Sequence, residues 1–188
     1  MLTLEYCQKL DAADPLAAMK QRFALPKNTI YLDGNSLGAR PKTANARAQV
    51  VVEQEWEQDL ISSWNTNNWW NLSLDIGNKV GKLVGAKADE VAVTDTTSGN
   101  LFKVLATALR IQSEASSERK IILAEREAFP TDLYIIQGMS DWLNQGYELQ
   151  LISGPEELQA ALYASVAAVV LFHVYSRIGV LWPLPDSA

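Results

Sequence analysis

A hydroxyl-rich turn that contains one glycine, Asp95-Thr96-Thr97-Ser98-Gly99-Asn100, offers the clearest chemistry in this chain. It lies between an apolar run expected to form a strand over residues 90–94 and an amphipathic run expected to form a helix over residues 101–111. A turn that opens a helix presents free backbone N–H groups at the positive end of the helix dipole, and such groups bind phosphate. The turn therefore predicts a site for a phosphorylated cofactor. The alternative is that Thr97 or Ser98 only caps the helix.

A second candidate site is the loop of residues 125–132, which follows an expected strand over residues 120–124. Pro130 biases Phe129 toward an extended backbone and so holds its ring in a defined direction. The ring could stack on a heteroaromatic group, and Asp132 could accept a hydrogen bond nearby. The alternative is that Thr131 and Asp132 cap the following helix while Phe129 is buried.

Two earlier segments could line a pocket. Gly34 and Gly38 bracket a polar turn that contains Ser36, although the same glycines could simply supply unusual backbone angles in a tight connection. Residues 63–70 combine three tryptophans with amides and hydroxyls. Each indole N–H and amide needs a hydrogen-bond partner, so this composition suits a site wall or a subunit contact, or else an aromatic loop folded onto the surface.

Composition excludes several classes of function. The chain of 188 residues carries a net charge of −6, which argues against nucleic acid and anionic membranes as partners. It has one cysteine, Cys7, and one histidine, His173, so we expect no disulfide, no metal site and no Ser–His–Asp hydrolase triad. No leader sequence and no apolar run of roughly 18 residues is apparent, so we expect a cytoplasmic protein without a membrane span.

The periodicity from residue 90 onward predicts an α/β fold with a mainly parallel sheet and flanking helices. Ligands of such open sheets bind beyond the carboxyl ends of the strands, so the two loops described above are expected to converge on one ligand. The first part of the chain is expected to hold helices and one short strand. The expected helices cover residues 4–10, 15–23, 41–59, 75–84, 101–111, 133–145 and 155–164, and the expected strands cover residues 30–32, 90–94, 120–124, 148–152 and 166–172.

Together these segments resemble kynureninase, the pyridoxal-phosphate (PLP) enzyme family of tryptophan breakdown. The resemblance covers about residues 1–180 and depends on the order and approximate spacing of four motifs. These are Tyr31-Leu32-Asp33-Gly34-Asn35-Ser36-Leu37-Gly38, Trp64-Asn65-Thr66, Thr97-Ser98-Gly99-Asn100-Leu101 and Phe129-Pro130-Thr131-Asp132.

The resemblance implies the large domain of a PLP-dependent transferase of the aspartate-aminotransferase type (fold type I). It also implies a homodimer that hydrolyses L-kynurenine to anthranilate and L-alanine, a step toward NAD precursors. Residues 1–40 would form an N-terminal helical arm with the glycine-bracketed turn, and residues 41–188 would form an incomplete PLP-binding large domain. By position in the motifs, the implied cofactor contacts are Thr97, Ser98, Phe129, Pro130, Thr131 and Asp132, and the implied substrate contacts are Ser36 and Trp64.

The sequence departs from the family in one decisive respect. The family carries an Asp-x-x-His segment and a Tyr-Lys pair whose lysine forms the Schiff base with PLP, and neither occurs here. Lys103 is not expected to replace that lysine, because it lies beside the wrong end of the cofactor. We therefore assign no catalytic residue and expect a truncated chain without hydrolase activity. The alternatives are another fold type I PLP enzyme, or an inactive fragment or association module with an unpaired sheet edge.

Overall fold

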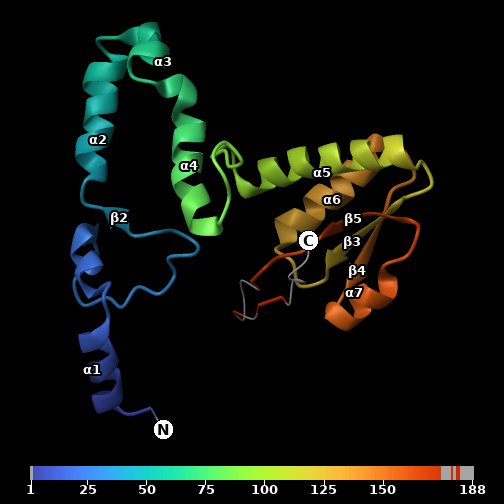
Figure 1. The fold of residues 1–188 in the computed structure, drawn as a ribbon, viewed down its shortest axis with the longest axis horizontal. Helices are drawn as coiled ribbons and strands as arrows, with labels where there is room; N and C mark the ends of the chain where they lie inside the picture. The colour runs from blue at the N-terminus through green and yellow to red at the C-terminus, as the bar shows by residue number, and fades with distance from the viewer. Residues whose placement is uncertain (1, 175–178, 180, 183–188) are drawn as a thin grey trace. The chain divides into compact units, whose positions relative to one another are not determined.

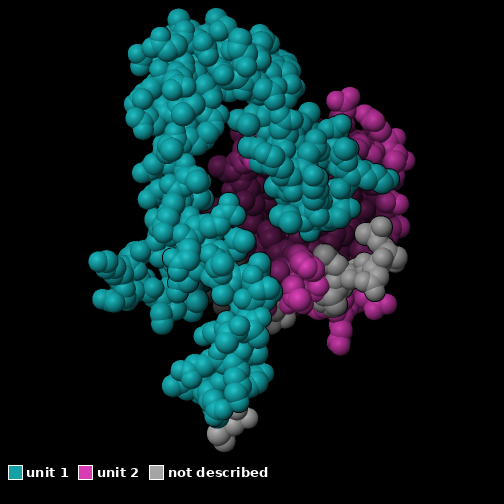
Figure 2. Space-filling view, turned by 60° about the vertical axis from the view of Figure 1, so that its left-hand side comes forward, with its two compact units in different colours: residues 1–92 teal, residues 93–188 magenta. Residues whose placement is uncertain are grey.

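The computed structural model describes residues 2–174, 179, 181 and 182 (Figure 1). The chain packs as two compact units, an N-terminal unit of residues 1–92 and a C-terminal unit of residues 93–188 (Figure 2). This division reflects which residues pack together, and it does not test the expected domain boundary after residue 40. The assignment of residues 1–40 to an arm and residues 41–188 to a large domain stays a prediction.

The N-terminal unit is built mainly from short helices. Thr3 caps the first of them, because its Oγ1 accepts the Tyr6 N–H at 3.2 Å. The long helix expected over residues 41–59 is present as an α-helix that continues into a turn of π-helix. In chain order the elements are α1 (Leu4–Ala13), η1 (Ala17–Arg22), β1 (Phe23–Ala24), β2 (Arg40–Pro41), α2 (Ala44–Val50), η2 (Val51–Trp56), η3 (Leu60–Ser62), α3 (Ser63–Thr66), η4 (Trp69–Asn71) and α4 (Leu72–Val84).

Two expected strands are wrong. Residues 30–32 form no strand, and the side chains of Ile30 and Leu32 are exposed, because no described strand pairs with them. Residues 90–94 form no strand either. There the backbone of Val91 packs against α4 so closely that a Cβ atom on Gly77 would lie 1.8 Å from the Val91 carbonyl oxygen. A strand propensity has no effect where the chain is held against a helix instead of a neighbouring strand.

The C-terminal unit has the predicted alternation of helices and strands. Its sheet has the order β4-β3-β5 within the described residues, and β3 pairs in parallel with both neighbours, with Ile121 opposite Glu148 and Glu125 opposite Ile152. A parallel sheet with flanking helices is thus confirmed, with one strand fewer than expected. The elements are α5 (Thr97–Ala115), β3 (Ile121–Glu125), α6 (Pro130–Leu143), β4 (Glu148–Ile152), α7 (Pro155–Ala161) and β5 (Val166–Val170).

Alternate residues of β3 point into two separate apolar cores, as a strand covered on both faces requires. Ile122 and Ala124 pack with residues of α5 and α6, and Leu123 packs with Ile152 and with Ala161 of α7. Figure 1 shows α5 and α6 on one side of the sheet and α7 on the other. The central strand therefore holds all three helices of this unit.

A buried carboxylate closes the second core. Glu125, the last residue of β3, is 1% exposed, and its Oε2 accepts the indole N–H of Trp182 at 2.6 Å. Trp182 is 3% exposed and packs with Leu123 and Val166. The other carboxylate oxygen of Glu125 has no hydrogen-bond partner among the described residues. The indole is therefore the donor that makes burial of this charged side chain tolerable.

Replacing Trp182 with phenylalanine keeps most of the apolar volume but removes the donor to Glu125. We expect the free energy of unfolding to fall by about 1–3 kcal/mol, the usual cost of leaving a buried polar group unpaired. Urea unfolding followed by far-UV circular dichroism measures this. The matched control is Trp142→Phe, because Trp142 is exposed and contacts Phe102 only through its ring. Equal losses in the two variants would contradict the role of the indole N–H.

Candidate cofactor and substrate site

The first turn of α5 carries the predicted phosphate ligands. The cap of this helix is Thr96, whose Oγ1 accepts the Gly99 N–H at 3.2 Å and whose carbonyl oxygen accepts the Asn100 N–H at 2.9 Å. The interpretation of Thr97 or Ser98 as the cap is therefore wrong. Both lie in the first helical turn, where their N–H groups have no acceptor within the helix. Their hydroxyls make no hydrogen bond to a described residue, so both kinds of donor are available to an anion.

An acidic side chain lies beside the first turn of α5, the predicted phosphate site. Asp95 directly precedes the cap residue Thr96, and a Cβ atom on Gly99 would lie 3.3 Å from the Asp95 Cβ. The Asp95 carboxylate forms an ion pair with Lys103 of the same helix. Lys103 thereby offsets the repulsion that Asp95 would exert on a bound phosphate.

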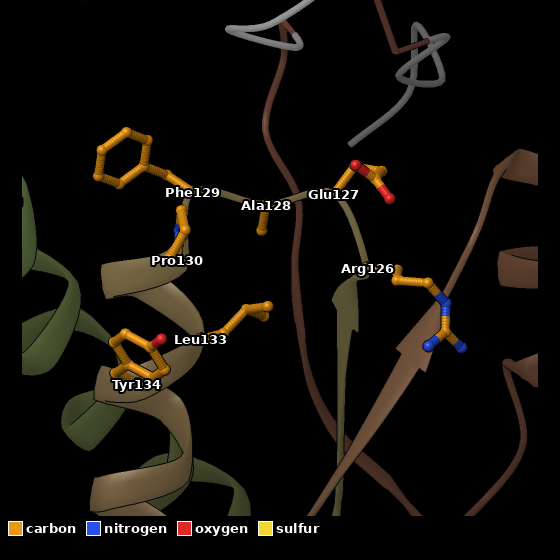
Figure 3. Close-up of a pocket in the computed structure, with 7 residues that line it drawn as sticks. All are labelled: Arg126, Glu127, Ala128, Phe129, Pro130, Leu133 and Tyr134. Atoms are coloured by element: carbon orange, nitrogen blue, oxygen red, sulfur yellow. The ribbon is translucent and has the colours of Figure 1, made fainter.

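A pocket opens where the loop after β3 enters α6 (Figure 3). Its volume is about 520 Å³. Phe129 has the extended backbone expected before proline, with φ −61° and ψ 133°, and the residue is 57% exposed. The alternative of a buried Phe129 is therefore wrong. The residues that line the pocket are Arg126, Glu127, Ala128, Phe129, Pro130, Leu133 and Tyr134.

Asp132 is buried in the first turn of α6 and does not line this pocket. It is 3% exposed, its N–H donates to the Phe129 carbonyl oxygen at 2.9 Å, and no described residue donates to its carboxylate. Burial raises the pKa of this carboxyl above its ordinary value of 3.8, because desolvation disfavours the charged form. Neither Thr131, which is exposed, nor Asp132 caps α6, because the cap position is Phe129 and no side chain bonds there.

The described contacts do not join the two halves of the predicted cofactor site. The pocket at Phe129 does not include Thr97 or Ser98. The ring contact between the two helices joins Phe102 of α5 to Trp142 in the last turn of α6, with centroids 6.1 Å apart. Convergence of these residues on one ligand stays a prediction.

The glycine-bracketed turn is held by its own hydrogen bonds. Ser36 Oγ donates to Asp33 Oδ1 at 2.8 Å, and Tyr31 Oη donates to the Leu37 carbonyl oxygen at 2.6 Å. Gly34 and Gly38 do not have positive φ angles, so the expectation of unusual backbone angles there is wrong in that respect. The hydroxyl of Ser36 is exposed but already bonded within the turn, and its role with substrate stays a prediction.

Trp64 belongs to a cluster of three indoles. Its ring lies edge-on to those of Trp69 and Trp70, each with centroids 6.2 Å away. Ile61, Trp64, Asn65 and Trp70 line a shallow hollow with a volume of about 390 Å³. Two of the three indoles thus line a hollow, and the role of the cluster as the wall of a binding site stays a prediction.

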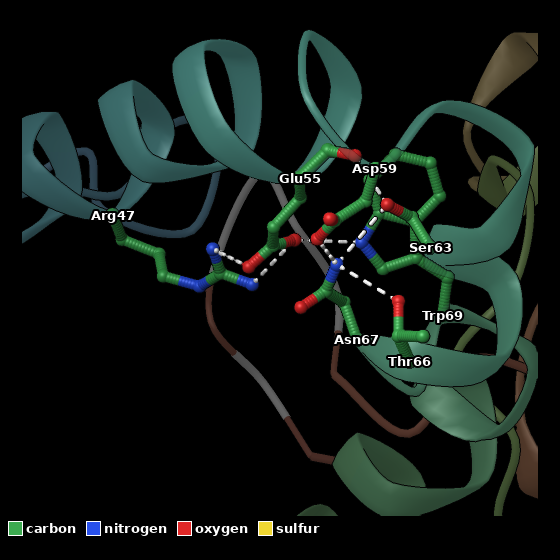
Figure 4. A network of polar contacts seen from close by, with 7 residues as sticks. All are labelled: Arg47, Glu55, Asp59, Ser63, Thr66, Asn67 and Trp69. Atoms are coloured by element: carbon green, nitrogen blue, oxygen red, sulfur yellow. Dashed lines mark hydrogen bonds and ion pairs between the residues drawn. The ribbon is translucent and has the colours of Figure 1, made fainter.

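Sequence reasoning missed the polar network behind this cluster (Figure 4). Arg47 Nη1 and Nη2 donate to Glu55 Oε1 and Oε2 at 2.7 and 3.2 Å, and Trp69 Nε1 donates to Glu55 Oε2 at 2.7 Å. Hydrogen bonds from Arg47, and then from Trp69, lower the pKa of Glu55 below its ordinary value of 4.5. The spacing of Arg47 and Glu55, about two helical turns, is the signal that could have indicated the pair.

In the described part of the chain, no helix is both long and apolar enough to cross a membrane. Among the same residues, no group of three or more histidine, cysteine, aspartate or glutamate side chains could hold a metal ion.

A parallel sheet with helices on both faces, and with polar loops at the ends of its strands, places the chain among the α/β proteins. No protein-family model matches it. Over 179 residues it is 54% identical to the kynureninase of Pseudomonas fluorescens, an alignment that covers 95% of this chain and 43% of the relative. Over 186 residues it is 49% identical to the kynureninase of Burkholderia mallei (strain SAVP1), covering 99% of this chain and 45% of the relative.

The chain is therefore homologous to kynureninases, which confirms the resemblance based on the four motifs. It spans less than half the length of these relatives, and the match is consistent with their N-terminal portion.

The Asp132 carboxyl predicts an unusual dependence of stability on pH. Because its pKa is raised in the folded state, the folded protein holds this proton to a higher pH than the unfolded chain does. The contribution of Asp132 to stability is thus most favourable below its ordinary pKa and is lost as the pH rises through the raised value. We expect Asp132→Asn to melt at a higher temperature than the original chain at pH 7–8, with a difference that disappears as the pH approaches 4.

Thermal unfolding across this pH range measures the effect. The matched control is Asp141→Asn on the exposed side of the same helix, which should change stability by less than about 0.5 kcal/mol at every pH. If Asp132→Asn instead melts lower at pH 7–8, the carboxylate is stabilised by the helix N-terminus more than it is destabilised by burial.

Proposed function

We propose that this chain provides the phosphate-binding and ring-stacking residues of a PLP site in a kynureninase of fold type I. The observation that supports this most strongly is the identity of about one half to kynureninases over nearly the whole chain. By this proposal the complete protein hydrolyses L-kynurenine to anthranilate and L-alanine in tryptophan breakdown, as a cytoplasmic homodimer.

The start of α5 fits the phosphate end of the cofactor. Thr97 and Ser98 offer two hydroxyls and two backbone N–H groups at the positive end of a 19-residue helix. The chain as a whole is negative, so a phosphate requires such a local concentration of donors. The ion pair of Lys103 with Asp95 keeps the nearest carboxylate from opposing it.

The start of α6 fits the ring end. The exposed face of Phe129 can stack on a pyridine ring, and Pro130 holds the backbone that directs it. The Asp132 carboxylate, which lacks a donor among the described residues, can accept a hydrogen bond from the cofactor, and Thr131 adds an exposed hydroxyl. PLP, when bound, supplies an electron sink for bond cleavage beside a carbonyl group.

Ser36 and Trp64 are proposed to contact kynurenine. Trp64 has the stronger support, because it lines a hollow together with Trp70. Its indole face is suited to the aromatic ring of the substrate.

The homodimer is proposed from apolar side chains that the C-terminal unit leaves on its surface. Val104, Tyr134 and Trp142 are all largely exposed on α5 and α6. Exposed apolar groups gathered on neighbouring helices are typical of surfaces that pack against another chain.

Binding of pyridoxine 5′-phosphate to the chain tests the phosphate site. This probe carries the phosphate and the ring but no aldehyde, so it cannot react with lysine. The double variant Thr97→Ala, Ser98→Ala should bind it at least about tenfold more weakly, because each hydrogen bond to a charged group is worth about 1.5–3 kcal/mol. Equilibrium dialysis measures the affinity.

The matched control is Thr107→Ala, which removes an exposed hydroxyl from a later turn of the same helix. Pyridoxine without phosphate should bind the original chain and the double variant equally. Unchanged affinity of the double variant for pyridoxine 5′-phosphate would place the phosphate elsewhere.

Activity is expected to be absent from the 188-residue chain. Neither an Asp-x-x-His segment nor a Tyr-Lys pair occurs in it, and PLP chemistry needs a lysine to carry the cofactor and to transfer protons. With L-kynurenine and added PLP, the rate of anthranilate release, followed by its fluorescence, should equal that of free PLP. A higher rate would show that a residue of this chain replaces the missing lysine.

A further inference from the structure

We propose that Glu55 is a positioning residue, which holds the Trp64–Trp70 pair as the wall of a binding site for a flat aryl amine. The choice of ligand depends on the proposed function, since the aromatic half of kynurenine is an aryl amine. Glu55 itself lines neither the hollow nor the predicted cofactor site.

The hollow has the groups that an aryl amine requires. Trp64 and Trp70 present two large aromatic surfaces set edge-on to each other, and both rings are partly exposed. Asn65 lies between them in the sequence, and its side-chain amide makes no hydrogen bond to a described residue. An amide can accept from an amino group and donate to a carbonyl oxygen, and both groups flank the ring of an ortho-amino aryl ketone.

Glu55 acts on this wall through the indole of Trp69. The Trp69 N–H donates to the Glu55 carboxylate, and the Trp69 ring meets Trp64 edge-on at an interplanar angle of 77°. Both oxygens of the carboxylate are also bound by the guanidinium of Arg47, so the acceptor has a fixed direction. The orientation of Trp69, and through it that of Trp64, therefore follows from this carboxylate.

The main chain of the same residue forms a second tether. The buried Ser63 hydroxyl donates to the Glu55 carbonyl oxygen. Asn67 then donates to Ser63 Oγ at 3.1 Å and to Asp59 Oδ2 at 2.8 Å, which closes the turn around the short helix α3 (Figure 4). Trp64 follows Ser63 directly in the sequence, and its ring packs against Trp69. Ser63 and Trp69 both donate hydrogen bonds to Glu55, so Glu55 fixes the backbone before Trp64 as well as the ring beside it.

Other carboxylates nearby do not share this role. Glu53 lies on the same helical segment, but it is exposed, and Gln49 is its only hydrogen-bond donor among the residues that the structure describes, at 2.9 Å. Asp59 contacts the network through Asn67 and does not touch an indole among the described contacts. Glu53 is thus a matched control for the charge and position of Glu55.

The test uses the full chain and anthranilate as the probe, with affinity measured by equilibrium dialysis and indole packing measured by near-UV circular dichroism. Glu55→Gln should weaken binding about tenfold and reduce the near-UV signal of the indole cluster, because the amide replaces one of the two acceptor oxygens that Arg47 and Trp69 use with an NH2 donor. Glu53→Gln should match the original chain in both measurements. Trp70→Ala removes an exposed wall of the hollow without opening a core, and it should also weaken binding.

A double-mutant cycle separates positioning from a general structural effect. In a Trp69→Phe background, which has no indole N–H, Glu55→Gln should cause little further loss of anthranilate affinity. An equal loss in both backgrounds would overturn the proposal, and so would an unchanged affinity in Glu55→Gln alone.

Failure of this proposal and failure of the proposed function are distinguishable. Pyridoxine 5′-phosphate binding, which depends on α5, is measured on the same samples. If the original chain binds that probe but not anthranilate, the aryl-amine site is wrong and the cofactor site stands. If it binds neither, both proposals fail.

Discussion

The parallel hydrogen-bond ladders of β3 are the interaction on which the C-terminal unit depends. This strand alone pairs on both edges within the described sheet, and its alternate side chains enter both apolar cores. Its last residue and the loop that follows it also set the start of α6. The predicted ring-stacking residues are therefore held by the most deeply packed strand of the unit, which is what a binding site on an α/β sheet requires.

Two buried carboxylates lie near the end of that strand, and their environments differ. Glu125 receives an indole N–H from a residue distant in sequence, whereas Asp132 has no donor among the described residues. Glu125 is thus tied to the second apolar core through Trp182. Asp132 is a nearly buried side chain whose carboxylate receives no hydrogen bond from a described residue. Fully enclosed oxygen atoms without a partner among the described residues occur instead on Asn100 and on Glu125.

Much of the fold could be predicted from the sequence because the signals are local. The strands at residues 121–125, 148–152 and 166–170 and the helices between them follow from apolar periodicity and from prolines at helix starts. The absence of the strand expected at residues 90–94 could not be predicted from local signals. A strand forms only where a partner strand is present, and here Val91 packs against Gly77 of a helix instead. The aromatic cluster was visible as composition, but its tie to Glu55 depends on a fold that brings Trp69 back toward α2 and η2.

The sequence by itself determined the class of fold, the family and the residue types available for a phosphate and an aromatic ring, because these depend on order and spacing along the chain. Only the tertiary structure decided that Thr96 caps α5, that Trp182 donates to one oxygen of Glu125 and that Asp132 is buried without a donor among the described residues. Each of these is a property of neighbours in space. Burial and hydrogen-bond satisfaction are set by those neighbours, and the linear pattern of residues does not specify them.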